Sequence, residues 1–177
     1  MLDACGVQDL IEENFLGQGM EHVVGVLPQH ARVIKDYDTF LFNEDTGEMA
    51  FKPTDSLFDY LTDHLLANRV FGDDLLLEGF YSVDENLHIV LSQPFILGHH
   101  KTQNLLISSL EERGLKHEKN TQFSVDGGDA GPLRVTDMHE DNVIFDKAGN
   151  AFVIDVHFRF SSRTDRIAAL KVLGLYD

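Results

Sequence analysis

Residues 135–155, VTDMHEDNVIFDKAGNAFVID, constrain the fold of this chain more than any other segment. Asp137 is followed five residues later by Asn142, and two short apolar runs, VIF and AFVI, come next. The intervening DKAGN contains the residue types of a tight turn, so the two runs predict a β-hairpin. The second run ends at Asp155, and the hairpin therefore returns this carboxylate toward the loop that carries Asp137 and Asn142.

The first part of the chain predicts a strand hairpin over residues 23–35. A segment with two glycines, Gly17 and Gly19, precedes the hairpin, and its second strand, ARVIK, ends at Lys35. Further on, NEDTG at 43–47 predicts a turn between two short apolar runs.

The middle of the chain predicts one helix and two strands. Apolar residues over 56–70 recur at a spacing that suits one helix face, and Asp55 or Ser56 is the expected cap. Residues 75–82 and 87–93 predict two strands joined by the turn VDEN, and Pro94 ends the second strand.

The rest of the chain predicts a second, smaller part after about residue 95. Residues 102–113 predict a helix with Gly114 as its C-cap, and DGGDAGP at 126–132 predicts a loop. A short strand at 133–136 leads into Asp137, and a short helix is expected after Arg163. Strands come mainly first and helices are few, which favours an α+β fold.

Three groups of residues in this order resemble the protein-kinase-like superfamily. Asp137, Asn142 and Asp155 match the catalytic loop and the metal-binding aspartate, with a hairpin between them. Gly17, Gly19 and Val24 match a glycine-rich loop, in which His22 replaces the third glycine, and RVIK ending at Lys35 matches the lysine strand. The compact form and the phrase LSQPF are similar to the kinase-like domains of polyvalent proteins from phages and conjugative elements.

The resemblance implies ATP and Mg²⁺ as cofactors and a phosphotransferase activity. It implies that Lys35 holds the phosphates, that Asn142 and Asp155 supply oxygen ligands for Mg²⁺, and that Asp137 is the catalytic base. The nucleotide would also contact Gly17, Gly19 and Val24, and the backbone of the hinge at 93–96, which contains Gln93 and Phe95. The implied fold is one domain, 1–177. It has a five-stranded antiparallel sheet with one helix in lobe 1–95 and a truncated lobe in 96–177.

The chain departs from the kinase pattern in ways that leave an alternative open. The helix at 56–70 has no glutamate to pair with Lys35, so Asp59 or Asp63 would have to serve. Only 22 residues follow Asp155, too few for an activation segment of normal length and a large helical lobe. A catalytically inactive nucleotide-binding or interaction module therefore stays open as the second hypothesis.

Two metal-site readings of the same segment are weaker. His139, Asp141 and His157 contain the residue types of an iron site, but the second histidine follows too soon for a jelly-roll to intervene. The alternating start Asp137, His139 and Asp141 mimics a calcium loop, yet that loop requires a glycine where Asn142 stands.

Composition limits the expected partners. The formal net charge of −16 argues against binding to nucleic acid or to an anionic membrane. No run of 18 apolar residues is present, and the single cysteine, Cys5, fits a reducing cytoplasm. The expected partners are a nucleotide and an acceptor, either a protein or a small molecule, that the sequence does not identify.

Overall fold

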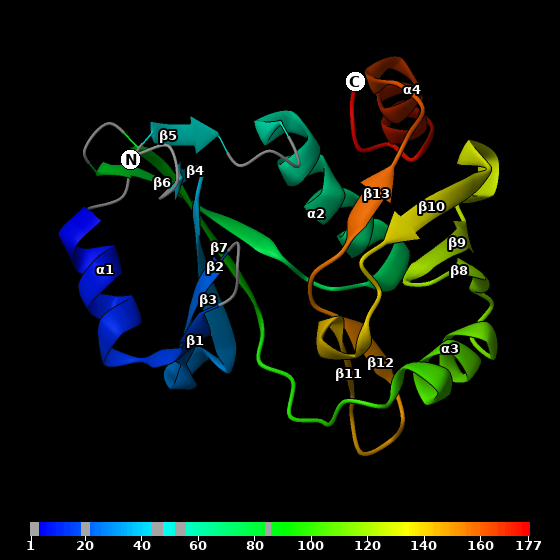
Figure 1. The fold of residues 1–177 in the computed structure, drawn as a ribbon, viewed down its shortest axis with the longest axis horizontal. Helices are drawn as coiled ribbons and strands as arrows, with labels where there is room; N and C mark the ends of the chain where they lie inside the picture. The colour runs from blue at the N-terminus through cyan, green and yellow to red at the C-terminus, as the bar shows by residue number, and fades with distance from the viewer. Residues whose placement is uncertain (1–3, 19–21, 44–47, 52–55, 84–85) are drawn as a thin grey trace. The chain divides into compact units, whose positions relative to one another are not determined.

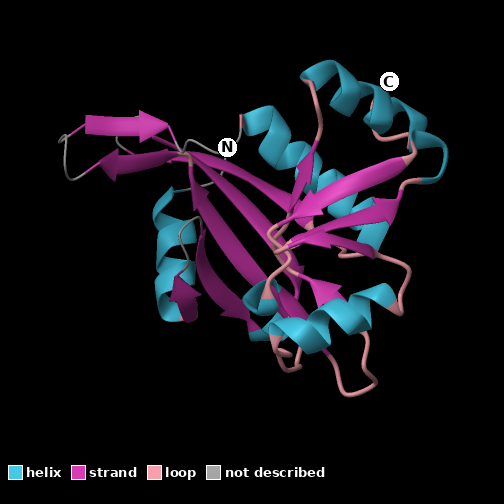
Figure 2. Cartoon of the chain, turned by 45° about the vertical axis from the view of Figure 1, so that its right-hand side comes forward, coloured by secondary structure: helices cyan, strands magenta, loops and turns pink. Residues whose placement is uncertain are grey.

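The computed structural model describes residues 4–18, 22–43, 48–51, 56–83 and 86–177. These residues form helices and antiparallel sheets (Figures 1 and 2), so the α+β prediction is confirmed. The chain divides into two compact units, one made of residues 1–59 and 74–95 and the other of residues 60–73 and 96–177. The segment 60–73, which we expected in lobe 1–95, is thus grouped with the second unit.

The first unit contains a five-stranded antiparallel sheet with the strand order β1-β2-β3-β7-β6. Its strands are β1 (Phe15–Gln18), β2 (His22–Leu27), β3 (Arg32–Asp38), β6 (Leu76–Val83) and β7 (Asn86–Pro94). The predicted hairpin over 23–35 is β2 and β3, which a short 3-10 turn, η1 (Pro28–His30), connects. β3 lies in the middle of the sheet, and five of its seven residues are buried.

Helix α1 (Ala4–Glu13) covers one face of this sheet. Its apolar side chains Val7 and Ile11 form a buried cluster with Ile34, Tyr81 and Val90 of the strands. Side chains alternate between the two faces of a strand, so Lys35, the neighbour of Ile34, lies on the opposite face. The helix therefore leaves the face of Lys35 to other contacts.

Gly25 in β2 allows the end of α1 to approach the sheet closely. A Cβ atom at this position would lie 3.3 Å from Ile34 Cγ2 and 3.4 Å from both the Asn14 carbonyl oxygen and Ile11 Cα. The Asn14 carbonyl then accepts a 2.8 Å hydrogen bond from the Val26 N–H, which ties the helix end to β2.

Two further strands in the first unit, β4 (Phe40–Asn43) and β5 (Glu48–Phe51), form an antiparallel pair. The turn predicted at 43–47 lies between them, and all of it except Asn43 is outside the described residues. The tip of the predicted VDEN turn, residues 84–85, and the possible cap Asp55 are also outside them.

A buried polar cluster around Asp36, the residue that follows Lys35 in β3, lies on the α1 side of the sheet. Asp36 accepts a 2.6 Å hydrogen bond from the Tyr81 hydroxyl, and His88 Nδ1 lies 3.2 Å from both carboxylate oxygens. The rings of Tyr81 and His88 stack at 4.5 Å between centroids. Burial raises the pKa of Asp36, and the hydrogen bond from Tyr81 and the charge of His88 offset this only in part.

The raised pKa of Asp36 predicts a specific pH dependence of stability. Its carboxyl group binds a proton more tightly in the folded state than in the unfolded chain. Its contribution to the free energy of unfolding is therefore fully present below the unfolded pKa of about 3.9 and is lost as pH rises through the folded pKa. Relative to Asp36→Asn, which still accepts from Tyr81, the wild type should lose stability as pH rises from about 4. Urea unfolding of both proteins over this pH range measures the difference, and a difference that grows in favour of the wild type would contradict the prediction.

The second unit contains most of α2 (Leu57–Phe71) together with α3 (Gln103–Glu111), α4 (Arg163–Val172) and two sheets. The larger sheet has the order β13-β10-β9-β8 and the smaller one pairs β11 with β12. These strands are β8 (Lys116–Lys119), β9 (Gln122–Asp126), β10 (Pro132–Thr136), β11 (Val143–Phe145), β12 (Ala151–Val153) and β13 (His157–Arg159). The predicted loop at 126–132 contains a 3-10 turn, η2 (Gly128–Ala130). β8, β9 and β13 were not predicted from the sequence.

Local signals place the helices where the sequence predicted them. Ser56 caps α2, because its hydroxyl accepts from the Asp59 N–H at 3.2 Å and donates to the Asp59 carboxylate at 2.9 Å. Gly72, with φ of 74°, ends the helix and donates to the Asn68 carbonyl. Ser162 caps α4 in the same way through the N–H of Asp165.

The core of the second unit consists of apolar side chains that are buried from solvent. Its most buried side chains come from α2, α3, both sheets and α4: Leu66, Leu106, Leu110, Phe123, Val135, Met138, Phe145, Phe158 and Leu170. Gly98 permits the chain entering this unit to lie against β11, because a Cβ atom there would overlap Ile144 and the Phe145 carbonyl. His99 and Phe145 then exchange two backbone hydrogen bonds of 2.9 Å.

A buried ion pair within the second unit joins α2 to α4. Asp63, only 2% exposed, accepts a 2.6 Å bond from Arg166 Nη1 of α4 and a 3.1 Å bond from the Phe158 N–H of β13. His157 Nδ1 lies 3.3 Å from its second oxygen. Arg166 also donates to the Thr62 hydroxyl and the Phe158 carbonyl, so both charges are fully engaged.

Candidate functional site

The loop after β10 brings Asp137 and Asn142 into direct contact. The Asn142 Nδ2 group donates to the Asp137 carbonyl at 3.0 Å and to its carboxylate oxygen Oδ2 at 3.3 Å. The loop is held by hydrogen bonds from the His139 N–H to the Asp137 carbonyl and from the Asn142 N–H to the His139 carbonyl. A short 3-10 turn, η3 (Glu140–Asn142), completes it.

Asp137 has an unusual backbone conformation. Its φ is 66°, in the left-handed region that non-glycine residues seldom adopt, although aspartate and asparagine tolerate it best. Such a conformation costs free energy and persists only where surrounding contacts impose it. Here the two hydrogen bonds from the Asn142 amide fix the residue, so the position of the carboxylate is determined by the loop.

The hairpin that follows returns the chain to Asn142, as the sequence predicted. Val143 of β11 pairs with Val153 of β12, and the next N–H along β12, that of Ile154, donates to the Asn142 carbonyl at 3.0 Å. Asp155 is the residue after Ile154. The second unit therefore brings the backbone at Asp155 to the loop that holds Asp137 and Asn142.

His139 is a neighbour of Asp137 that we did not assign to the site. Its Nε2 atom lies 3.6 Å from Asp137 Oδ1, while its Nδ1 atom accepts from the Asp141 N–H at 3.3 Å. The signal that could have found it is its place two residues after Asp137, on the same tight loop.

In the first unit, three of the predicted nucleotide-binding residues form one row across the sheet. Gly17 of β1 is paired with Val24 of β2, and Val24 is paired with Lys35 of β3. Directly paired residues on adjacent strands share a face, and this face is the one opposite α1. Lys35 is 6% exposed, so its position is not that of a solvated strand-end lysine.

The predicted hinge residues are also placed by this sheet. Gln93 of β7 is paired with Val33, two residues from Lys35, and is buried on the same face. The Phe95 N–H donates to the Ala31 carbonyl at 2.8 Å, so this hinge donor is used within the unit. Gly19 lies outside the described residues.

The helix carboxylates that we considered as partners of Lys35 have other contacts. Asp63 is engaged with Arg166, His157 and the Phe158 N–H inside the second unit. Asp59 takes part in the cap of α2 with Ser56. Burial raises the pKa of Asp63, and the hydrogen bond from His157 and the charge of Arg166 lower it again in part.

The donor set at Asn142 and Asp155 fits Mg²⁺ bound together with phosphates. The Asn142 NH₂ group is used on Asp137, which leaves the amide oxygen as the free ligand atom, and Asp155 supplies a carboxylate. No group of three or more His, Cys, Asp or Glu residues within the described ranges could hold a metal ion by itself. Mg²⁺ commonly takes one or two protein oxygens and completes its shell with phosphates and water, so two protein ligands suffice.

Comparison with known proteins gives a match to a protein family. A family model described as "Serine/Threonine/Tyrosine Kinase found in polyvalent proteins" matches residues 7–162. No curated protein and no solved structure gives a match. Separately, none of the helices in the described part of the chain is long and apolar enough to span a membrane.

Proposed function

Because this chain belongs to the family of serine/threonine/tyrosine kinases found in polyvalent proteins, we propose that it transfers the γ-phosphoryl group of ATP to a hydroxyl group. The acceptor is a protein side chain or a small molecule. The net charge of −16 and the single Cys5 support a cytoplasmic protein that binds neither nucleic acid nor membrane.

One observation carries this proposal. Hydrogen bonds link Asp137, Asn142 and the strand that ends before Asp155. The Asn142 side-chain amide donates to Asp137, and the Ile154 N–H donates to the Asn142 carbonyl. Phosphoryl transfer requires positioning and charge stabilisation more than covalent chemistry. A fixed carboxylate beside an amide oxygen and a second carboxylate supplies the residue types for both tasks.

In the proposed reaction Asp137 orients the acceptor hydroxyl and receives its proton. The hydroxyl oxygen forms a bond to the γ-phosphorus while the bond between that phosphorus and the bridging oxygen of ADP breaks. The proton of the hydroxyl passes to the Asp137 carboxylate, and ADP leaves with the electron pair of the broken bond. The Asn142 amide keeps the Asp137 carboxylate in place during this step.

The remaining assignments concern binding. Asn142 Oδ1 and the Asp155 carboxylate would hold Mg²⁺, which when bound neutralises charge on the phosphates. Lys35 would hold the phosphates, with Gly17 and Gly19 providing backbone near them. Val24 and the hinge residues Gln93 and Phe95 would contact the base.

The second candidate function is a nucleotide-binding or interaction module without catalysis. The engagement of Asp63 with Arg166 favours it, because this carboxylate of α2 is held within the second unit and is not offered to a phosphate-binding lysine as in active kinases. The two candidates differ in whether phosphate is transferred, and an interaction module does not require nucleotide.

A thermal melt with Mg²⁺ alone and with Mg²⁺ plus ATP tests the nucleotide site. ATP present at one hundred times its Kd should stabilise the fold by about 2.7 kcal/mol, a shift of a few degrees for a chain of this size. The shift should require Mg²⁺ and should disappear in Lys35→Met and in Asp155→Ala. Lys147→Gln, at an exposed lysine in the β11–β12 turn, is the matched control and should keep the full shift.

The outcomes separate the hypotheses. No shift at millimolar ATP would overturn nucleotide binding and the kinase function, and would favour the interaction module. A Mg²⁺-dependent shift without phosphate transfer to any acceptor would favour the non-catalytic module.

A further inference from the structure

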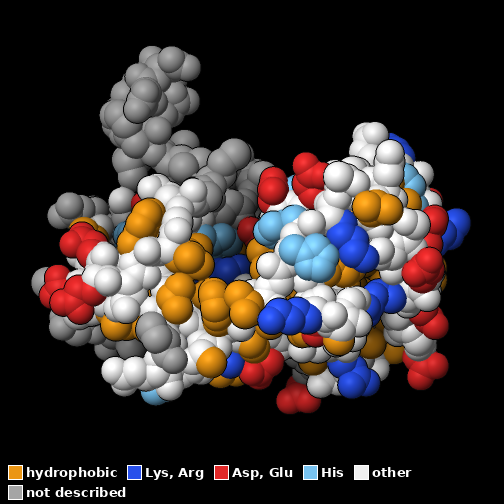
Figure 3. Space-filling model, turned by 90° about the horizontal axis from the view of Figure 1, so that it is seen from below, with side chains coloured by type: hydrophobic (Ala, Val, Ile, Leu, Met, Phe, Trp, Pro, Cys, Tyr) orange, Lys and Arg blue, Asp and Glu red, His pale blue; other side chains and the backbone are white. Residues whose placement is uncertain are grey.

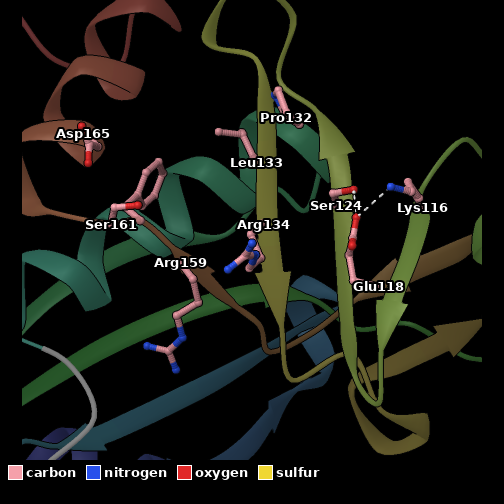
Figure 4. A pocket seen from close by; sticks show the side chains of 10 residues that line it. Lys116, Glu118, Ser124, Pro132, Leu133, Arg134, Arg159, Ser161 and Asp165 are labelled. Carbon is pink, nitrogen blue, oxygen red and sulfur yellow. Dashed lines mark hydrogen bonds and ion pairs between the residues drawn. The ribbon is translucent and has the colours of Figure 1, made fainter.

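A basic pocket lies on the exposed face of the β8–β9–β10–β13 sheet, outside the residues assigned above. It has a volume of about 570 Å³, and Lys116, Arg134, Arg159, Phe160, Ser161 and Asp165 are among its lining residues. Figure 4 shows Lys116, Arg134 and Arg159 on the sheet strands and Ser161 and Asp165 near the start of α4. The pocket lies entirely within the second unit.

The strand register aligns three cations across the sheet in this pocket. Arg159 of β13 is paired with Arg134 of β10, Arg134 with Ser124 of β9, and Ser124 with Lys116 of β8. Two arginines directly opposite each other on adjacent strands repel one another, so the arrangement is unfavourable without a compensating anion.

Two carboxylates, Glu118 and Asp165, also line the pocket, and both have other contacts. Glu118 lies 3.3 Å from Lys116 Nζ and accepts a 3.0 Å hydrogen bond from Ser124, and these contacts lower its pKa. Asp165 accepts from the Ser162 hydroxyl at 2.8 Å as part of the α4 cap. Within the described residues, no hydrogen bond or ion pair holds the Arg134 guanidinium.

The Arg134 charge helps to lower the pKa of Glu118, but it makes no direct contact with that carboxylate. The sequence has 30 acidic and 14 basic residues, and on the face drawn in Figure 3 the two kinds of side chain are interspersed. An exposed arginine would therefore be expected to find a carboxylate nearby. The pocket instead keeps the Arg134 guanidinium beside a second arginine and the Phe160 ring without a direct bond to a carboxylate in the described part of the chain, which is the composition of a site for an anionic ligand.

The pocket is connected to Asp137 along β10. Arg134 and Thr136 lie on the same face of the strand, and Arg159 Nε donates to the Thr136 hydroxyl at 3.3 Å. Asp137 is the next residue. Asp137 is three positions after Arg134, which corresponds to about 10 Å along a strand, and an extended peptide covers the same distance in three residues.

We propose that this pocket binds the acidic side chain of a polypeptide acceptor, three residues away from the serine, threonine or tyrosine that is phosphorylated. This inference rests on the proposed kinase function and adds the class of substrate to it. The overall negative charge of the chain does not oppose such binding at contact distance, because salt screens charges beyond about 8 Å at physiological ionic strength.

Peptide binding without ATP tests the pocket independently of catalysis. The probe is a fluorescent ten-residue peptide with one central serine and aspartates at the third position on both sides. The reference peptide has asparagines at those two positions. The acidic peptide should bind about tenfold more tightly than the reference, and Arg134→Gln should remove this preference.

Two control variants define what the loss means. Arg134→Lys keeps the charge and should retain most of the preference, whereas Lys147→Gln removes one charge from the exposed β11–β12 turn and should leave it unchanged. Equal binding of the two peptides to the wild type would contradict the proposed role of the pocket. So would a preference for the acidic peptide that survives Arg134→Gln. If the acidic preference holds while ATP gives no thermal shift, the pocket stands as a peptide site and the kinase function fails. If ATP binds and the preference is absent, only the pocket assignment fails.

Discussion

Replacing Asp63 by alanine should destabilise the protein by about 3–5 kcal/mol, because the change leaves the buried charge of Arg166 without its carboxylate. Arg166 is 4% exposed and Asp63 is 2% exposed, so water cannot replace the lost partner. The same carboxylate also accepts from the Phe158 N–H, which would become a second unsatisfied group. The midpoint of urea unfolding, followed by circular dichroism, measures the loss.

Two further variants distinguish a broken ion pair from general damage to the helices. Asp165→Ala removes an exposed carboxylate from the first turn of α4 and should cost at most about 1 kcal/mol. The double variant Asp63→Ala with Arg166→Met should be less destabilised than the sum of the two single changes, because neither charge is then buried alone. Additive losses would mean that the pair contributes no coupling and that packing alone explains the effect.

The local elements were predictable where the sequence carried strong local signals. The 23–35 hairpin, the helix at 56–70 and the Asp137–Asp155 segment combine clear periodicity with turn and cap residues, and each is present in the structure. β8 and β9 were missed because KHEK and QFSVD contain few apolar residues. These strands are defined by their pairing with β10 rather than by their own pattern.

The partners of charged side chains were less predictable than the elements. The spacing of Asp137 and Asn142 indicated that both lie on one short loop. Asp63 and Arg166 are 103 residues apart in the chain, and no local pattern relates them. The same holds for Arg134 and Arg159, whose pairing depends on β13. This strand has only three residues and lies close after Asp155, so its sequence resembles that of a loop.

Replacing Asp137 by asparagine should lower the rate of phosphate transfer by about 10²- to 10⁴-fold, the usual contribution of a positioned general base. The substitution is well suited to the site. Asparagine tolerates the φ of 66° at this position, and its amide oxygen can still accept from Asn142 Nδ2. The variant should therefore keep its fold and its ATP-dependent thermal shift while it loses turnover, measured as radiolabelled phosphate transferred to the acidic serine peptide.

Asp141→Asn is the matched control, because it makes the same chemical change on the same loop. The Asp141 side chain is 81% exposed, and its carboxylate lies 3.7 Å from His139 Nδ1. Its loss should change turnover by less than about twofold, since exposed pairs of this kind contribute little. If both variants lost activity equally, the negative charge of the loop rather than a proton acceptor at Asp137 would matter. If Asp137→Asn kept full turnover, the acceptor hydroxyl would be activated by another group, and His139, 3.6 Å from the Asp137 carboxylate, would be the next residue to replace.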